Sequence, residues 1–309
     1  MEQRREFTYP SADGRTMIHA VEWRPEGAPV GVLQIAHGVA EYALRYEPFA
    51  RYMTAHGFLV TANDHLGHGT SVADDAPQLY FGEKGSWQYV VDDMYTLRCR
   101  TGEEHPGLPY FLMGHSMGSF LTRTYLIRYP GTVTGAILMG TGQNPGTVLL
   151  GGKALAALLA KANGRESTSA LVERLAFGTY NKAFAPNRTG YDWLSVNEGN
   201  VDAFLADPLC GGQVTTGLVL EMLDGLRLIQ KPANLRRMDR STPVLFISGD
   251  RDPVGDMGRG VCAAYESFRR AGVCDVERKL YPGLRHEILN ESVRETVYAD
   301  LWDWIERHR

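Results

Sequence analysis

The sequence lacks several features that would place it in other classes of protein. It has no run of about 18 apolar residues, so we expect no helix that spans a membrane. Its first residues, MEQRREFTYP, carry charge with no apolar segment behind them, so we expect no signal peptide. Its 32 Lys and Arg are outweighed by 36 Asp and Glu, which gives a net charge of −4, and no basic block is present. We therefore expect no nucleic-acid partner.

Cysteine is also scarce. The 309 residues include four cysteines, none with CxxC spacing: Cys99, Cys210, Cys262 and Cys274. A chain of this length does not need disulfides for stability, so we expect small buried thiols in a reduced, cytoplasmic setting. The sequence has no internal repeat and no low-complexity segment, and none of its motifs requires a cofactor.

Short runs of apolar, β-branched and aromatic residues recur along the chain. Most are continuous rather than alternating, which is typical of strands buried on both faces of a parallel sheet; they cover residues 30–37, 58–64, 110–114, 135–140 and 243–250. A weaker run follows at 276–283. The run at 16–23 comes after SADGR, whose Asp-Gly pair is typical of a hairpin turn. We therefore expect an antiparallel hairpin at one edge of the sheet.

Segments with helical periodicity lie between these runs. Apolar residues recur at helical spacing over 117–129 and 258–272. A third stripe near the C-terminus consists of Val293, Val297, Leu301, Trp304 and Ile305. This alternation predicts an α/β fold with a mostly parallel sheet. Because only helical segments and loops occupy 143–238, we expect a helical cap there, inserted between two parts of an α/β core at 1–142 and 239–309.

The stretch YFLMGHSMGSF at 110–120 contains a candidate nucleophile. Its centre is G-x-S-x-G, and it lies directly after a predicted strand and directly before a predicted helix. Glycines on both sides permit a sharp turn that exposes the hydroxyl of Ser116. The N-terminus of the following helix directs N–H groups and a positive dipole end to the same place. We therefore predict that Ser116 is a nucleophile.

A serine nucleophile needs a base, and nine histidines are candidates for that role. His286 follows the last strand-like run and precedes the last helix, so it should lie at the same edge of the sheet as Ser116. The others are in less suitable positions or have simpler roles: His19, His37, His56, His105, His115 and His308. We expect His37 and His115 to make local hydrogen bonds. His65 and His68 form an H-x-x-H pair, but they lie in a glycine-containing loop with no evident third ligand, so we expect no metal site.

The base needs an orienting acid, which should follow another strand at that edge. The segment VLFISGDRDPVGD offers Asp250, Asp252 and Asp256. Asp250 is still at the strand end, whereas Pro253 fixes the turn after Asp252, so the spacing favours Asp252. The chain order Ser116, Asp252, His286 is typical of the α/β-hydrolase arrangement.

An oxyanion hole requires two N–H donors aimed where negative charge develops. One candidate is the backbone N–H of Met117, the residue after the nucleophile. The other should come from the loop after an earlier strand, and IAHGVAEYALRY is such a loop. We predict that the N–H of Val39, just after His37 and Gly38, is the second donor.

Taken together, these segments resemble the monoacylglycerol lipase and lysophospholipase branch of the α/β-hydrolase superfamily, a group also described as serine aminopeptidase-like hydrolases. The matching segments span almost the whole chain: HGVAEYALRYEPFARYM, NDHLGHGTS, YFLMGHSMGS, DWLSVNE with DPLCGG, PVLFISGDRDPVG and YPGLRHEILNE. The resemblance implies an eight-stranded, mostly parallel sheet with helices on both faces and a cap after strand 6. It also implies Ser116 as nucleophile, Asp252 as acid and His286 as base, with Val39 and Met117 as oxyanion donors.

Two positions depart from the pattern of that family. Val39 and Ala40 follow His-Gly where smaller residues are frequent, and Ser119 stands where glycine is frequent. Because the oxyanion donor is a backbone N–H, Val39 should still serve.

The resemblance implies a serine carboxylic ester hydrolase acting on monoacylglycerol- or lysophospholipid-like esters, with no cofactor or metal. A small-molecule ester with an acyl chain is then the expected partner, with transient contact to lipid surfaces, and the apolar cap residues would line an acyl pocket. The alternative is a serine aminopeptidase or amidase using the same triad, which needs cap carboxylates to bind an amino group. The cap acids available are Glu173, Asp192, Glu198, Asp202, Asp207, Glu221 and Asp224. A third hypothesis, a non-enzymatic ligand sensor, is disfavoured because all three triad candidates are present.

Overall fold

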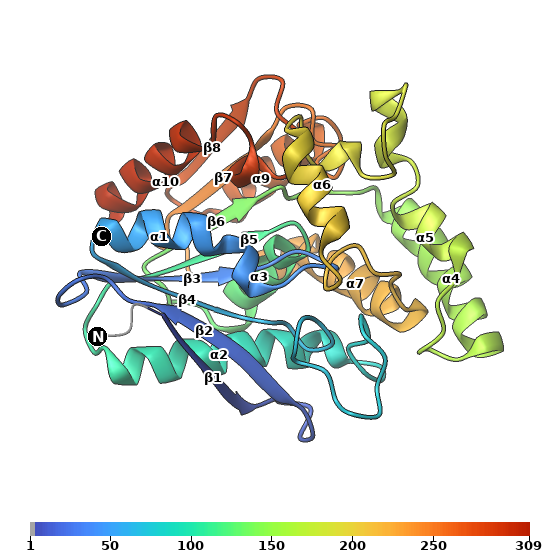
Figure 1. The fold of residues 1–309 in the computed structure, drawn as a ribbon, viewed down its shortest axis with the longest axis horizontal. Helices are drawn as coiled ribbons and strands as arrows, with labels where there is room; N and C mark the ends of the chain where they lie inside the picture. The colour runs from blue at the N-terminus through green and yellow to red at the C-terminus, as the bar shows by residue number, and fades with distance from the viewer. Residues whose placement is uncertain (1–3) are drawn as a thin grey trace.

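An eight-stranded sheet forms the centre of the computed structural model, which describes residues 4–309 (Figure 1). Its strands are β1 (Arg4–Pro10), β2 (Met17–Trp23), β3 (Gly31–Ala36), β4 (Phe58–Asn63), β5 (Tyr110–His115), β6 (Gly135–Met139), β7 (Val244–Gly249) and β8 (Val276–Tyr281). Their order is β1-β2-β4-β3-β5-β6-β7-β8. β1 pairs antiparallel with β2 and β2 with β4, and every other pairing is parallel. The predicted fold class and edge hairpin are confirmed.

Helices cover both faces of the sheet (Figure 1). One face packs against α1 (Glu47–Ala55) and α10 (Arg294–His308), and the other against α2 (Ser86–Glu104), α3 (Met117–Arg128) and α9 (Arg259–Ala271). Every residue of β3, β4, β5, β6 and β7 is buried, which explains their continuous apolar sequences. One expected core residue is misplaced: Val293 precedes α10 and is exposed, because the helix begins only at Arg294.

The chain between β6 and β7 contains no strand that belongs to the sheet. Its helices are α4 (Gly146–Asn163), α5 (Ala170–Ala176), α6 (Glu198–Ala206), α7 (Thr216–Ile229) and α8 (Pro232–Leu235), with two 3-10 turns, η2 (Tyr180–Phe184) and η3 (Asp192–Leu194). In Figure 1, α4 and α5 lie outermost on the right, and α7 lies between them and α3. This group of helices therefore lies at the end of the sheet where the parallel strands finish.

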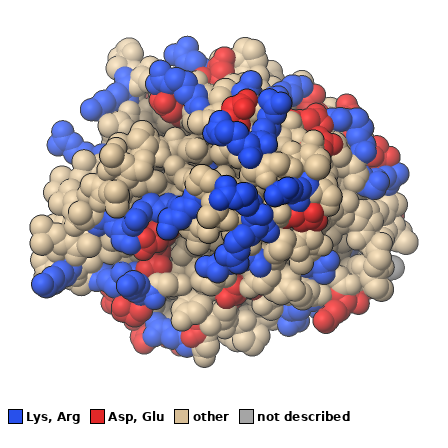
Figure 2. Space-filling view, turned by 180° about the vertical axis from the view of Figure 1, so that it is seen from behind, with Lys and Arg blue, Asp and Glu red and all other residues tan. Residues whose placement is uncertain are grey.

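The surface carries apolar and charged side chains in different places. On α4 and α5 several large apolar side chains are exposed: Val148, Leu150, Leu158, Leu171 and Leu175. On the face shown in Figure 2, basic side chains gather near the centre and acidic ones lie among and around them. Within residues 4–309, no helix is both long and apolar enough to cross a bilayer.

Candidate active site

Ser116 lies at the sharp turn between β5 and α3. Its backbone has φ 53° and ψ −121°, a left-handed conformation that is costly for any residue with a side chain. The N–H of Ser116 holds the turn in place, because it donates to the carbonyl of Met139 on β6 at 2.9 Å. The side chain is nearly buried, with 8% of the residue exposed. This strained turn places the hydroxyl at the C-terminal edge of the sheet.

The glycines of the motif are required by close contacts between backbones. A Cβ at Gly114 would overlap the carbonyl oxygen of Gly118, and one at Gly118 would overlap the carbonyl oxygen of Ala36. The Cβ at Gly118 would also lie 2.6 Å from the carbonyl oxygen of His37. Gly118 therefore allows α3 to pack directly against the loop that follows β3.

We expect Gly118→Ala to lower both stability and activity. The added methyl meets backbone atoms that cannot rotate away, so overpacking should destabilise the fold by about 1–3 kcal/mol. Displacing the loop after β3 should also lower kcat/KM by about 100-fold, since small misplacements near reacting groups have large effects. Thermal unfolding and steady-state kinetics measure the two effects. Gly151→Ala on α4 is the matched control, because a Cβ there meets nothing within 4 Å; equal behaviour of the two variants would contradict the steric argument.

Asp252 and His286 lie together at the same edge. His286 Nδ1 is 2.9 Å from Asp252 Oδ2, and both residues are buried. Asp252 also accepts hydrogen bonds from the hydroxyl of Ser248 at 3.0 Å and the N–H of Val254 at 2.9 Å. Burial by itself would raise the pKa of Asp252, but the charge and hydrogen bond of His286 and these other donors outweigh it, so the pKa lies below its usual value. The carboxylate is therefore ionised at neutral pH.

The other two acids of that segment are engaged elsewhere. Asp250 accepts from the N–H of Gly283 at 2.7 Å, and Asp256 forms an exposed ion pair with Arg259 at 2.7 Å. Neither contact involves His286. Of the three acids considered from the sequence, Asp252 is the one bonded to the histidine.

The His286 ring packs between two other rings. The ring centroids of His115 and Trp193 are 4.6 Å and 5.1 Å from its own. On another side a Cβ at Gly140 would lie only 3.0 Å from His286 Cε1, so glycine is needed there. Within residues 4–309 the Ser116 hydroxyl makes no hydrogen bond to this ring, although both residues line one cavity. In ligand-free hydrolases this bond is often long and shortens when substrate binds.

The loop after β3 lies directly against Ser116. A Cβ at Gly38 would be 3.2 Å from Ser116 Cβ, so the backbone that leads into Val39 approaches Ser116 closely. Among the described residues, the Val39 N–H donates to no other group. The N–H of Met117 is the first of α3 and has no acceptor within the helix. Both predicted oxyanion donors are thus unoccupied beside Ser116.

Sequence reasoning missed a buried ionic network beside the site. Glu41 accepts from the N–H of Gly38 at 2.6 Å and from Arg45 at 2.6 Å. Arg45 also makes two bonds to Glu287, at 2.9 Å and 3.0 Å, and Glu287 accepts from Asn200 of α6 at 2.7 Å. The only sequence signal was position: Glu41 follows the His-Gly pair, and Glu287 follows the candidate base.

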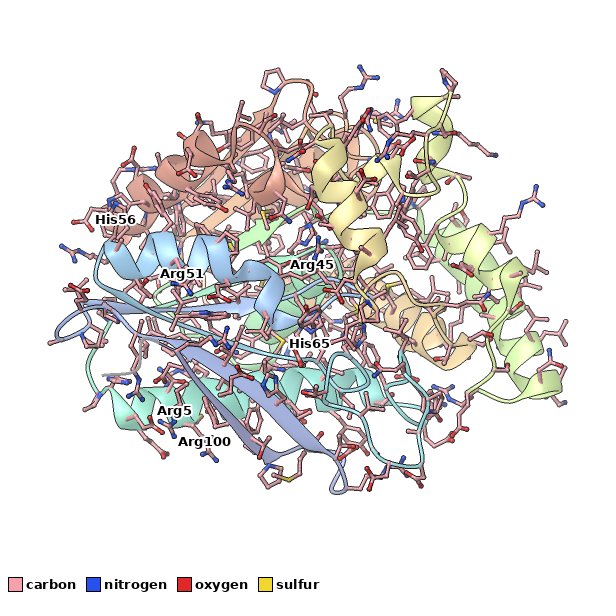
Figure 3. All side chains as sticks on the ribbon, viewed as in Figure 1. Arg5, Arg45, Arg51, His56, His65 and Arg100 are labelled. Atoms are coloured by element: carbon pink, nitrogen blue, oxygen red, sulfur yellow. The ribbon has the colours of Figure 1, made fainter. Side chains whose placement is uncertain are left out.

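The charges of this network keep its acids ionised. Burial favours a higher pKa for Glu41, but its hydrogen bond with His115 and the charge of Arg45 hold the pKa well below its usual value. Burial acts in the same way on Glu287, and the charge of Arg45 again lowers the pKa. Arg45, labelled in Figure 3, also contacts α6, because its guanidinium carbon is 4.9 Å from the centroid of the Phe204 ring. The network therefore connects the loop beside Ser116, the loop of His286 and α6.

The H-x-x-H pair lies inside the core. His65 and His68 are fully buried with ring centroids 6.4 Å apart, and the N–H of His65 donates to His37 Nε2 at 2.8 Å. Burial lowers the pKa of His65 well below its usual value and that of His68 to about 3, so both rings are neutral. His37 has the local bond expected from the sequence, to the carbonyl of Gly38 at 2.7 Å.

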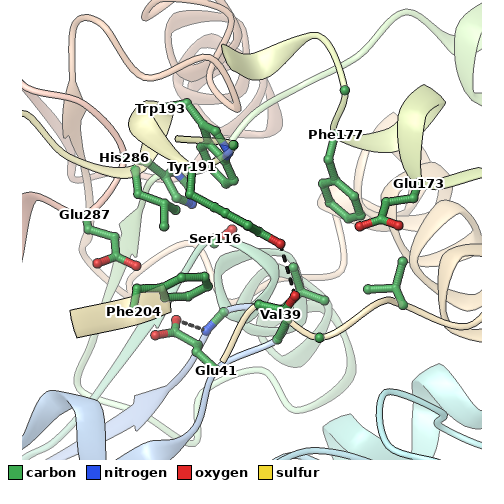
Figure 4. Close-up of a pocket in the computed structure, with 18 of the residues that line it drawn as sticks. Val39, Glu41, Ser116, Glu173, Phe177, Tyr191, Trp193, Phe204, His286 and Glu287 are labelled. Atoms are coloured by element: carbon green, nitrogen blue, oxygen red, sulfur yellow. Dashed lines mark hydrogen bonds between the residues drawn. The ribbon is translucent and has the colours of Figure 1, made fainter. Parts of the chain in front are cut away.

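Two cavities meet at Ser116. One of about 390 Å³ is lined by His286 and by polar and aromatic side chains that include Glu41, Glu173, Tyr191, Phe204 and Glu287. Figure 4 shows Ser116 at its centre, with Tyr191 extending across it and bonded to Gly211. The second, of about 160 Å³, is mostly apolar and is lined by Met117, Phe120 and side chains of α4, α5 and α7. An ester bond at Ser116 would thus have space on both sides.

Comparison with known proteins gives consistent matches over nearly the whole chain. The profile of the family described as serine aminopeptidase, S33, matches residues 27–293. A monoacylglycerol lipase of Mycolicibacterium smegmatis is 30% identical over 307 residues, covering 99% of this chain and 98% of that protein. The monoglyceride lipase of Homo sapiens is 26% identical over 302 residues, covering 96% and 88%. Among solved structures, a thermostable carboxyl esterase from Bacillus coagulans, in complex with glycerol, has a TM-score of 0.92 and 29% identity, covering 100% and 99%.

Proposed function

The chain belongs to the serine aminopeptidase S33 family of α/β-hydrolases, and from this premise we propose that it is a serine carboxylic ester hydrolase acting on monoacylglycerol-like esters. The observation that carries the proposal is the placement of Ser116, Asp252 and His286 at one edge of the sheet, beside two cavities. The names of the relatives, a monoacylglycerol lipase and a carboxyl esterase, support this substrate class.

In the proposed mechanism, Ser116 attacks the ester carbonyl while His286 takes its proton. Asp252 holds the His286 ring in the required tautomer and stabilises the imidazolium that forms. The N–H groups of Val39 and Met117 stabilise the oxyanion, each by about 3–4 kcal/mol. His286 then protonates the leaving alcohol, and water hydrolyses the acyl-enzyme by the same steps. These steps use only side chains and backbone N–H groups of the chain and water.

We also propose that residues 143–238 act as a cap that supplies the acyl pocket. The apolar cavity of about 160 Å³ contains side chains of α4, α5 and α7, all of which lie in this range. The larger cavity has carboxylates and a tyrosine, which suit the hydroxyl groups of an alcohol leaving group. The two cavities therefore offer space on either side of Ser116, the smaller for the acyl chain and the larger, which also contains polar groups, for the alcohol.

The aminopeptidase alternative receives less support from the acids of the cap. Most of them already have partners within the protein: Asp192 with the N–H of Thr189, Asp202 with Arg188, Asp207 with Tyr42, Glu221 with Arg165 and Asp224 with Lys153. Among the seven acids considered from the sequence, only Glu173 lines the larger cavity. The carboxylates of the larger cavity are also engaged, Glu41 and Glu287 with Arg45 and Glu173 with Gln213, so a peptide ammonium would have to compete with these partners.

A substrate panel tests the choice between the two activities. We expect kcat/KM for a long-chain monoacylglycerol to exceed that for an aminoacyl anilide by at least about 100-fold, because the anilide places an ammonium where few partners are free. Esters of increasing acyl length report on the apolar cavity, and Gly152→Leu on α4, which lines it, should shift the preference to shorter chains. Faster cleavage of the anilide would reject the ester assignment.

Location and lipid contact belong to the same proposal. The exposed apolar side chains of α4 and α5 support transient contact between the cap and lipid surfaces. A cytoplasmic location remains a prediction that rests on the few cysteines; within residues 4–309 all four are free thiols.

A further inference from the structure

His115, the residue before Ser116, has oxygen atoms facing both nitrogens of its ring. It is the last residue of β5 and is 4% exposed. Its Nδ1 is 2.8 Å from the hydroxyl of Tyr46 and 3.2 Å from Glu41 Oε1. Its Nε2 is 3.4 Å from the carbonyl oxygen of His286. The expectation that this side chain makes local hydrogen bonds is therefore wrong, because its partners lie far from it in the sequence.

The partners of His115 determine which of its nitrogens carry protons. The Tyr46 hydroxyl has one proton, and it lies 2.8 Å from Glu41 Oε1, which can only accept. With that proton directed to Glu41, the Tyr46 oxygen accepts from His115 Nδ1. The carbonyl of His286 also only accepts, so Nε2 must carry a proton to bond to it. A neutral imidazole has one N–H, whereas an imidazolium has both.

The surrounding charges favour that cation. The titratable and charged groups that face His115 or share its network are Glu41, Arg45, Tyr46, His37, Asp252, His286 and Glu287. Burial by itself would lower the pKa of His115, but the hydrogen bond and charge of Glu41 and the charges of Glu287 and Asp252 raise it above its usual value. Arg45 is paired with the carboxylates of both Glu41 and Glu287. The network therefore has two negative charges and one positive charge, and a second positive charge on His115 would balance it.

We propose that His115 is a positioning residue whose imidazolium form holds the main chain of His286, and thereby sets the catalytic ring against Ser116. The inference rests on the proposed function, because it takes His286 as the base. The contacts support it: the two rings pack at a tilt of 40° with centroids 4.6 Å apart, and Gly140 leaves the space that both rings occupy. His115 thus links Glu41, in the loop beside Ser116, to the loop of His286.

This role predicts a specific pH dependence. His115 donates both bonds only below its own pKa, which lies above the usual value for histidine. Activity should therefore fall on the alkaline side as His115 loses a proton. A side chain that merely fills space would produce no alkaline limb.

Nitrogen-15 NMR of histidine-labelled protein tests the protonation state without reference to activity. The signals of His115 are identified by their loss in His115→Gln. We expect a doubly protonated ring that titrates above about 6.5, the ordinary value for histidine. A single-tautomer neutral ring at pH 6 would overturn the proposal.

Kinetics tests the positioning role. His115→Gln retains an amide donor that does not titrate, so the alkaline limb of kcat/KM should disappear, whereas His115→Ala should lose about 3- to 10-fold at the optimum, as for one hydrogen bond. His56→Gln is the control, since His56 lies at the far end of α1 and away from Arg45 in Figure 3. An alkaline limb unchanged in His115→Gln would overturn the positioning role. Failure of the wild-type protein to react with a fluorophosphonate would instead reject the proposed function.

Discussion

Replacing Ser116 with alanine is expected to lower kcat for ester hydrolysis by about 10⁴- to 10⁶-fold, the range seen when a serine nucleophile is removed. The turn itself should survive, because it is held by the N–H of Ser116 and by close backbone contacts rather than by the hydroxyl. What remains should be the small acceleration given by substrate binding and the oxyanion donors. Steady-state kinetics with a monoacylglycerol measures the loss.

Ser119→Ala is the matched control for this variant. Ser119 lies in the first turn of α3 and donates its hydroxyl to the carbonyl of Ser116 at 2.6 Å, so it shares the site's surroundings but not its proposed chemistry. We expect a change of no more than about 10-fold, the size associated with one hydrogen bond. A fluorophosphonate should label wild-type protein and Ser119→Ala at Ser116 and leave Ser116→Ala unlabelled, as mass spectrometry would report. Full esterase activity in Ser116→Ala would reject the nucleophile assignment.

Replacing Asp252 with asparagine should lower kcat by about 10⁴-fold, because an amide cannot hold the histidine in the required tautomer or stabilise its cation. Asp252 is 0% exposed and bonds directly to His286 Nδ1, so water cannot take its place. Asp250→Asn is the control, because it makes the same chemical change two residues away. The Asp250 side chain accepts a hydrogen bond from the N–H of Gly283 and not from His286. A larger loss in Asp250→Asn than in Asp252→Asn would contradict the assignment of the acid.

The pH dependence of stability gives a second measurement on the same pair. The pKa of Asp252 is lower in the folded protein than its usual value, so its contribution to stability is present above the unfolded-state pKa. That contribution is lost as the pH falls through the lowered folded value. Asp252→Asn should therefore flatten the acid side of the stability curve, which denaturant unfolding at several pH values would show.

Much of the fold could be predicted because its signals are local. The strands at 30–37, 58–64 and 243–250 were found within one or two residues, since parallel strands buried on both faces need continuous apolar sequence. The boundary of α10 was missed by one residue at Val293, because an apolar stripe does not show where helical backbone begins. The preference for Asp252 over Asp250 came from the position of a proline, which also acts locally.

The ionic network is the part that sequence reasoning did not find. Glu41 and Glu287 are about four fifths of the chain apart in sequence, and they come together through Arg45 only when β3 and β8 have taken their places in one sheet. The partners of His115 are hidden from the sequence for the same reason, since Tyr46 and the carbonyl of His286 come from segments far apart in the chain. Residue spacing carries no information about such long-range pairs.

The sequence by itself determined the strand–turn–helix around Ser116, the alternation of strands and helices, and the order of the candidate triad residues. Each of these follows from backbone geometry or periodicity within a few residues. Only the tertiary structure decided that Asp252 meets His286, that the loop of Gly38 and Val39 lies against Ser116, and that two cavities join there. These features depend on packing between distant segments. The three-dimensional contacts therefore bring the local motif together with a buried acid, a histidine and two cavities.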